Sequence, residues 1–175
     1  MTEDDLGRIE QALGVTLPKA YRSRMLAFPI PALAGNSEDE LWDDAAEIIR
    51  LNQELRKGNS VSKPWPPHML ALGRDGSGCQ IAIDLRNPEG PVWWVDRTHL
   101  DQSGPWEKPF EAWFEEWVVE TKEGLEDDGI DPMGSPQARE EGRSRIANAG
   151  CRNMIVFIVI VTVILIIIKI AFFRK

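Results

Sequence analysis

The C-terminal part of the chain constrains it most, because residues 154–173 read MIVFIVIVTVILIIIKIAFF. Eighteen of these 20 residues are apolar, and the exceptions are Thr162 and Lys169. As a helix rising about 1.5 Å per residue, the stretch is about 30 Å long, which matches the hydrocarbon core of a bilayer. The alternative is a core helix or strand, for which so small a soluble body offers little room. We therefore predict a transmembrane helix over residues 154–173.

The flanking residues predict how the chain is placed. Four arginines precede the apolar stretch within residues 139–152, whereas Arg174 and Lys175 follow it. This excess places the N-terminal domain in the cytoplasm by the positive-inside rule. The opening MTEDDLGRIEQALG is acidic and amphipathic, unlike a signal peptide. Residues 123–153 lack apolar periodicity and contain glycines and prolines, which predicts a flexible linker. We expect a single-pass membrane protein, anchored at its C-terminus, with a soluble domain over residues 1–122.

The charge is unevenly distributed within a net charge of −8. Residues 1–138 carry 13 basic and 26 acidic residues, whereas residues 139–175 carry 7 basic and 2 acidic residues. An acidic domain repels the phosphates of nucleic acid, so we expect no nucleic-acid partner. The charge suits a basic protein partner, or no charged partner at all.

Hydrophobic periodicity predicts helices and an antiparallel meander in the soluble domain. Thr2 and Asp5 form a capping-box variant at the start of the first helix, and Gly14 ends it. A second helix begins at Pro18 and stops at about Phe28. Further segments are a helix over 45–57, strands over 69–72, 80–85 and 92–95, and an aromatic helix from residue 109. The inward positions of the helix over 45–57 are predicted to be Ile48, Ile49 and Leu55.

Three segments in this order resemble the SUKH superfamily, the Knr/Smi-like domain. The opening IEQALGVTLPKAYRSRM has two helices around an "LP" break. The central LALGRDGSGCQIAIDL has a strand, a glycine-rich turn and a strand ending in Asp, and FEAWFEEWV forms the final aromatic helix. The matching positions are Leu17, Pro18, Tyr21, Gly73, Asp75, Gly76, Gly78, Asp84, Trp113 and Trp117.

The resemblance implies an α+β fold, with a small antiparallel sheet flanked by helices. Bacterial members of the superfamily are commonly immunity proteins, which bind and neutralise a cognate toxin. Fungal members are regulatory scaffolds, so a membrane-anchored scaffold without a toxin partner is the alternative. Neither role is catalytic. Partner-binding residues vary between members, so the resemblance assigns none to this chain.

Tryptophans beside acidic residues are candidates for contact with a basic partner. Trp42 stands next to Asp43 and Asp44 in an acidic loop, and Trp65 lies in a proline-rich loop. Either these loop tryptophans are exposed contact residues, or they fold onto the core. Trp93 and Trp94 point to opposite faces of a strand, so one is buried and the other, taken here as Trp94, is covered by a helix or available to a partner.

Catalytic patterns are weak in this sequence. A Ser77–His99–Asp84 triad can be written, but a triad is defined by geometry and Ser77 stands in a turn. The DGSG segment at residues 75–78 lacks the helix and lysine that a phosphate-binding loop requires. Asp127, Asp128 and Asp131 lack the spacing of a calcium loop. We expect no catalytic residue, metal, cofactor or small-molecule substrate.

Overall fold

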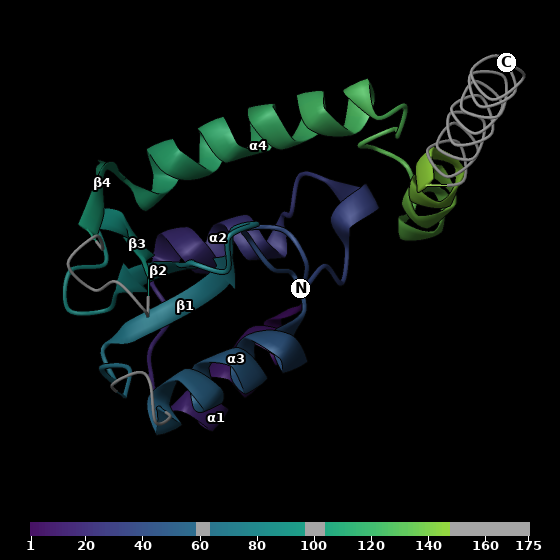
Figure 1. Cartoon of the computed structure of the whole chain (residues 1–175). Coiled ribbons are helices and arrows are strands. Elements are labelled where there is room, and N and C mark those ends of the chain that lie inside the picture. The colour runs from purple at the N-terminus through teal and green to yellow at the C-terminus, as the bar shows by residue number, and fades with distance from the viewer. Residues whose placement is uncertain (59–63, 97–103, 148–175) are drawn as a thin grey trace, which may run out of the picture.

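A computed structural model describes residues 1–58, 64–96 and 104–147. They form an α+β fold in which a four-stranded antiparallel sheet is packed with helices (Figure 1). The strands are ordered β1-β2-β3-β4, so each pairs with its neighbour in sequence. Helix α3 lies against β1 with α1 packed on it, whereas α4 lies against β3 and β4. The predicted α+β class, with a small antiparallel sheet flanked by helices, is confirmed.

The first two helices begin and end near the predicted residues. Helix α1 spans Glu3–Leu13, and the Oγ1 of Thr2 accepts from the backbone N of Asp5 at 3.2 Å. Asp5 in turn accepts from the backbone N of Thr2, and Gly14 ends the helix at φ 64°. Helix α2 spans Lys19–Leu26, so it stops two residues before the predicted end. A short 3-10 helix, η1, spans Pro31–Leu33.

The sheet contains one strand that the sequence did not indicate. Strands β1 Met69–Arg74, β2 Gln80–Asp84 and β3 Pro91–Val95 lie within two residues of their predicted ranges. Strand β4 spans Gly104–Pro109 and pairs with β3 alone. Its sequence GPWEKP has two prolines and no apolar alternation, so it gives no strand signal. Proline is tolerated in β4 because an edge strand leaves half of its backbone groups unpaired.

Helix α3 spans Ala45–Lys57, as predicted. Ile48, Leu51 and Leu55 are buried, whereas Ile49, which was expected to face inward, is only partly buried. The reason is that α3 packs between α1 and the outer edge of β1. The face that meets this edge includes the polar Asn52, which apolar periodicity does not detect.

Helix α4 spans Phe110–Asp127 and buries the predicted aromatic face. Trp113 and Trp117 stack with ring centroids 6.3 Å apart, and Phe110 packs edge-on against Tyr21 of α2 at 5.8 Å. On the side facing α2, Arg24 donates to Glu111 at 2.8 Å. Since large aromatic rings bury much apolar area, this face packs α4 firmly against the core.

The segment predicted as a flexible linker over 123–153 differs from that prediction where it is described. Residues 123–127 are the last residues of α4, and residues 136–147 form a further helix, coloured yellow-green in Figure 1. Ser135 caps this helix by accepting from the backbone N of Ala138 at 3.2 Å. Ile130, Pro132, Arg139 and Gly142 are buried. Few apolar side chains make these contacts, so hydrophobic periodicity gave no signal for them.

The predicted transmembrane stretch over 154–173 lies outside the described residues. Among helices within residues 1–147 that are described, none combines the length and the apolar character needed to span a bilayer.

Candidate functional site

A loop over residues 36–44 carries five carboxylates and is held in place by one asparagine. The side chain of Asn36 donates to the carbonyl O of Leu41 at 2.8 Å. Its Oδ1 accepts from the backbone N of Glu38 at 3.1 Å and of Asp39 at 3.4 Å. These side-chain bonds take the place of backbone–backbone hydrogen bonds in the loop. They fix the backbone from which the side chains of residues 38–40 project.

Gly73 of β1 allows this loop to lie directly against the sheet. A Cβ at position 73 would lie 2.2 Å from the carbonyl O of Glu40 and 2.8 Å from Cδ1 of Trp42. The backbone N of Trp42 donates to the carbonyl O of Leu72 at 3.0 Å. The position therefore requires glycine, because any side chain would push the loop away from β1.

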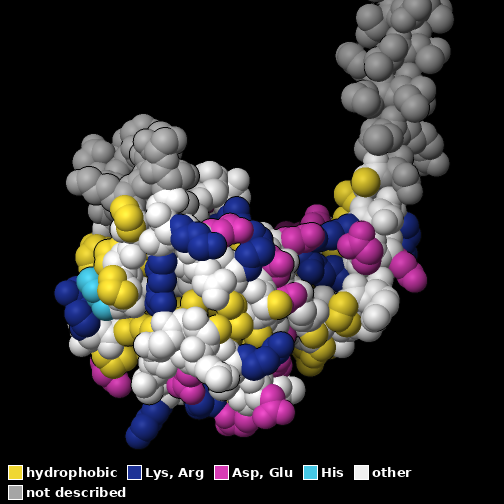
Figure 2. All heavy atoms as spheres, turned by 90° about the horizontal axis from the view of Figure 1, so that it is seen from below, with side chains coloured by type: hydrophobic (Ala, Val, Ile, Leu, Met, Phe, Trp, Pro, Cys, Tyr) yellow, Lys and Arg dark blue, Asp and Glu magenta, His cyan; other side chains and the backbone are white. Residues whose placement is uncertain are grey.

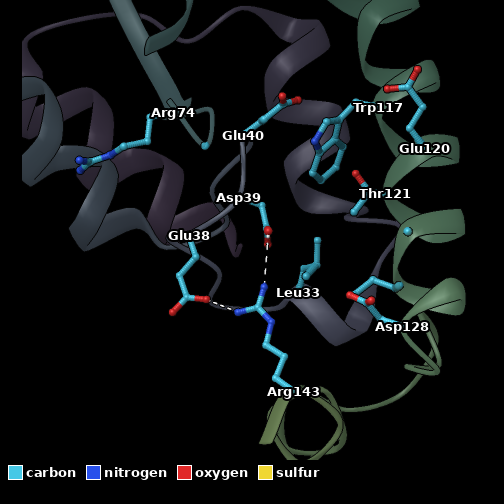
Figure 3. Close-up of a pocket in the computed structure, with 13 residues that line it drawn as sticks. Leu33, Glu38, Asp39, Glu40, Arg74, Trp117, Glu120, Thr121, Asp128 and Arg143 are labelled. Atoms are coloured by element: carbon cyan, nitrogen blue, oxygen red, sulfur yellow. Dashed lines mark hydrogen bonds and ion pairs between the residues drawn. The ribbon is translucent and has the colours of Figure 1, made fainter. Parts of the chain in front are cut away.

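A cleft of about 440 Å³ lies between this loop, α4 and the helix over 136–147 (Figure 3). Buried Leu33, Trp117 and Leu125 form its deeper, apolar part. Five carboxylates also line it, and we call the whole the acidic cleft: Glu38, Asp39, Glu40, Glu120 and Asp128. An apolar interior with a charged opening is the arrangement found at many protein-binding surfaces.

Two arginines line the acidic cleft, but they are placed differently. The guanidinium of Arg74 lies 5.1 Å from the ring centroid of Trp42, and Figure 3 shows its side chain pointing away from Arg143. Arg143 reaches between Glu38 and Asp39 (Figure 3). The negative charge of the cleft therefore exceeds the positive charge that lines it.

Burial and mutual repulsion affect the acid–base behaviour of the carboxylates here. Desolvation raises the pKa of Glu40 above its usual value, and the nearby charges of Asp75, Glu120 and Asp39 raise it further. Desolvation also raises the pKa of Asp75, but hydrogen bonds from Ser77, Trp94 and Cys79 outweigh it and leave the pKa lowered. Within residues 1–58, 64–96 and 104–147, Glu40 forms no ion pair that offsets this repulsion, whereas Asp75 is held by hydrogen bonds.

The helix over 136–147 contacts the acidic loop through charged side chains. Arg139 Nη2 lies 2.8 Å from Asp39 Oδ2, and Arg143 forms an ion pair with Glu38. The space-filling view shows acidic and basic side chains gathered where this helix meets the body (Figure 2). The backbone N of Ala32 also donates to the carbonyl O of Pro132 at 3.2 Å. The cleft thus has a wall from a part of the chain that was expected to be a linker.

Of the two alternatives for the loop of Trp42, Asp43 and Asp44, the structure shows the one in which the tryptophan folds onto the core. Trp42 is 1% exposed and belongs to the core, because the approach at Gly73 brings its ring against β1. Asp43 is 8% exposed and pairs with the α-ammonium group of Met1 at 2.7 Å. Asp44 caps α3 by accepting from the backbone N of Ala46 at 2.9 Å. These three residues hold the loop, and its carboxylates at 38–40 face the cleft.

The other two candidate tryptophans are also tied to the fold. Trp65 is 7% exposed and donates from Nε1 to the carbonyl O of Met69 at 2.9 Å, so it is not an exposed contact residue. Trp94 is half-buried and donates from Nε1 to Asp75 Oδ2 at 2.7 Å. Trp94 therefore links β3 to the turn between β1 and β2.

The positions that carry the sequence resemblance have structural roles. Leu17, Tyr21, Trp113 and Trp117 are buried in the core. Pro18 immediately precedes α2, and Gly78 adopts φ 88° in the turn after β1. Asp84 accepts from Arg86, and Gly76 lines the acidic cleft. Gly76 and Trp117 line the cleft itself, and Gly73 lies directly against the backbone of Glu40, which also lines it.

In the described part of the chain, Ser77 and Asp84 of the Ser77–His99–Asp84 pattern do not come together as a catalytic triad requires. Ser77 precedes β2 and donates to Asp75 Oδ1 at 2.6 Å, whereas Asp84 ends β2 and pairs with Arg86 at 2.7 Å. Ser77 and Asp84 therefore lie at opposite ends of β2, each with another partner. His99 lies outside the described residues.

The sequence analysis named Asp43 and Asp44 from the acidic loop, whereas the carboxylates that line the cleft are those of Glu38, Asp39 and Glu40. The signal for Glu38, Asp39 and Glu40 is the run of three acids at the middle of the loop. Glu120 and Asp128 come from the polar side of α4 and the residue after it, more than 70 residues away in sequence. Only the packing of α4 beside the loop brings these groups to one cleft.

The comparisons with known proteins give one match. The profile described as the SMI1 / KNR4 family (SUKH-1) matches residues 1–118, which is more than half of the chain. Searches of curated proteins and of solved structures give no match. The matched range ends within α4, so it contains the sheet and the acidic loop but excludes the helix over 136–147.

Proposed function

The chain belongs to the SMI1/KNR4 family (SUKH-1), and on this premise we propose that it is a non-catalytic immunity protein. It binds and neutralises a cognate bacterial toxin by direct contact. The toxin carries a basic surface, since the domain that meets it is strongly acidic.

The observation that carries this proposal is the acidic cleft. It combines buried apolar side chains with five carboxylates, which outnumber the two lining arginines and Arg139, the further arginine that pairs with Asp39. Glu40 illustrates the imbalance, because desolvation and neighbouring carboxylates raise its pKa. A basic partner would relieve this repulsion, and the apolar part of the cleft would add packing area.

The mechanism we propose is occlusion at stoichiometric ratio. The negative field of the domain speeds the encounter with a basic toxin, and the cleft then receives basic side chains of the toxin. A toxin that binds the phosphates of nucleic acid needs a basic surface to do so, and covering that surface would stop the activity without any chemistry by the immunity protein.

Membrane anchoring is part of the proposal and rests on the sequence of residues 154–173. Anchoring would concentrate the domain on the cytoplasmic face of the membrane, where an imported toxin first emerges. Fractionation of cells by high-speed centrifugation tests this step. The full chain should sediment with membranes and resist extraction by salt or carbonate, whereas a chain truncated after residue 147 should stay in the supernatant.

Co-expression with a toxin encoded beside this gene tests the binding function. The wild-type chain should restore growth, and D39N/E40Q/E120Q should weaken binding of the purified toxin by at least about tenfold. The matched control E89Q/E123Q/E126Q removes the same charge at exposed sites outside the cleft. Equal loss in both variants would show that net charge alone acts. Absence of rescue by a well-expressed wild-type chain would favour the alternative, a membrane-anchored regulatory scaffold.

A further inference from the structure

The acidic cleft already binds two arginines, and both come from this chain's own helix over 136–147. Arg139 Nη2 lies 2.8 Å from Asp39 Oδ2 and 3.7 Å from Glu38 Oε2. Arg143 pairs with Glu38, and its Nη2 lies 3.6 Å from Asp39 Oδ1. Each guanidinium therefore contacts both carboxylates. The spacing of four residues places both arginines on one face of the helix.

We propose that Glu38 and Asp39 recognise an arginine-bearing helix of the basic partner, and that the chain's own helix over 136–147 occupies this surface until the partner displaces it. The existence of the partner rests on the proposed function. The recognition chemistry rests on the contacts just described, in which the surface already binds arginines presented four residues apart on a helix.

The contact of the chain's own helix is built so that it can dissociate. The Glu38 side chain is 65% exposed and the Arg143 side chain 36%, so solvent and salt screen their ion pair. Arg139 is 9% exposed, and its Nε has no hydrogen-bond partner within the described residues. Burial thus opposes the charge of Arg139, and its pKa is lowered by desolvation. The ion pairs hold the helix in place, but the net free energy that they contribute to this contact is small.

Apolar packing adds only a small anchor to this contact. Ile130 is buried. A Cβ at Gly142 would lie 2.7 Å from Cγ1 of Ile130, so the helix contacts Ile130 through Gly142. In contrast, Met133 is 63% exposed and Ile146 is 44% exposed. The helix therefore buries one narrow face, and neither Ile146, its largest apolar side chain, nor Met133, which precedes it, is buried.

A partner helix can make more ion pairs than the chain's own helix does. Within the described residues, Glu40, Glu120 and Asp128 line the cleft but form no ion pair. In the described part of the chain, the internal helix supplies no cation to these three groups, and Arg145 donates to the carbonyl O of Glu141 in its own helix. An incoming helix with further arginines would pair with them and so replace the internal one.

A binding measurement with a synthetic helix tests the inference. The probe is an acetylated, dye-labelled alanine-based peptide with three arginines spaced four residues apart, and the protein is the full chain in non-ionic detergent. Fluorescence anisotropy at about 50 mM salt, where screening is weak, gives the Kd. R139Q/R143Q should bind the peptide at least fivefold more tightly than the wild-type chain, because the internal competitor is lost.

The matched control is R8Q/R145Q, which changes the net charge equally. Among the described residues, exposed Arg8 pairs with Asp5 in α1, and Arg145 lies on the helix over 136–147 but does not line the cleft. We expect this control to change the Kd by less than twofold. Adding E38Q/D39N to R139Q/R143Q should abolish the gain. If R139Q/R143Q and R8Q/R145Q bind alike, the inference is wrong.

Two further measurements keep the outcome clear. Because replacing the buried Arg139 could disturb folding, the half-exposed Arg143 is also replaced alone. R143Q should bind the peptide more tightly than R145Q. Circular dichroism checks that both variants are folded. Failure of the proposed function appears instead as absence of toxin rescue with the peptide result intact. Toxin rescue with equal peptide binding by all variants would reject this inference and leave the proposed function standing.

Discussion

The side-chain amide of Asn52 pairs with both backbone groups of Ala71. Its Nδ2 donates to the carbonyl O of Ala71 at 2.9 Å, and its Oδ1 accepts from the backbone N at 2.9 Å. Nδ2 also donates to the carbonyl O of Ile48. Asn52 is fully buried, so this pairing takes the place of a neighbouring strand at the open edge of β1. At the next residue of β1, the carbonyl O of Leu72 accepts a hydrogen bond from the backbone N of Trp42, which belongs to the acidic loop over residues 36–44.

Replacing Asn52 with Leu should destabilise the domain by about 2–4 kcal/mol. The variant keeps the volume but leaves a buried N–H and C=O of Ala71 unpaired. Urea unfolding followed by tryptophan fluorescence measures the effect. The adjacent, exposed Gln53 provides a control on the same helix, and Gln53→Leu should change stability by less than about 0.5 kcal/mol. Equal stability of the two variants would contradict the role assigned to Asn52.

Gly73→Ala should also destabilise the domain, by about 2–3 kcal/mol, and should weaken binding to a basic partner. The new Cβ would lie 2.2 Å from the carbonyl O of Glu40, a backbone atom that cannot move without moving the acidic loop. Gly76→Ala is the control, because nothing lies within 4 Å of its Cβ and its φ is not positive. A Gly73→Ala variant as stable as Gly76→Ala would refute the close approach.

Glu40→Gln should stabilise the domain at pH 7, by less than about 1 kcal/mol, while it weakens partner binding. The pKa of Glu40 is raised in the folded state, so the ionised form is disfavoured there. Stability linked to this group is present below its unfolded pKa and is lost as pH rises through the folded pKa. The gain from Gln should therefore be seen at pH 7 and vanish near pH 4, as measured by urea unfolding at both values. A variant that is less stable than wild type at pH 7 would oppose this account.

Asp75 should contribute to acid unfolding in the opposite direction. Its pKa is lowered in the folded state, so its contribution is present above the unfolded pKa of about 3.9 and is lost as pH falls through the folded pKa. The unfolding free energy of Asp75→Asn should decline less steeply than that of wild type between about pH 4 and pH 2. Asp127→Asn, at the exposed end of α4, removes one carboxylate away from the turn of Asp75 and is the control variant. Parallel curves for wild type and Asp75→Asn would exclude this contribution.

Local signals in the sequence determined most of the elements, because caps and periodic apolar residues act over a few positions. Helix α1 begins at the cap formed by Thr2 and Asp5 and ends at Gly14, as predicted. The spacing of the aromatic residues in α4 identified its buried face. Strand β4 escaped notice because it is held by pairing with β3, and its own residues do not favour a strand. The transmembrane stretch and its consequences remain predictions from composition.

The assignment of the candidate site depended on tertiary structure, and two of its residues show why. Trp42 and Glu40 are two positions apart in one acidic loop, and the sequence alone could not say which of them faces solvent. The loop passes so close to Gly73 that the ring of Trp42 is buried against β1, whereas the carboxylates of residues 38–40 line the cleft. The hydrogen bond from the backbone of Trp42 to Leu72 of β1, 30 residues away, determines which of the two side chains is buried.

The sequence by itself determined the family, the acidic character of the domain and the apolar nature of residues 154–173, since these are properties of composition and local order. Only the tertiary structure decided that Arg139 and Arg143 meet Glu38 and Asp39 across about 100 residues. Ion pairs leave no periodic trace in a sequence, because their partners are chosen by the fold of everything between them. For that reason a segment that reads as a linker forms a wall of the acidic cleft.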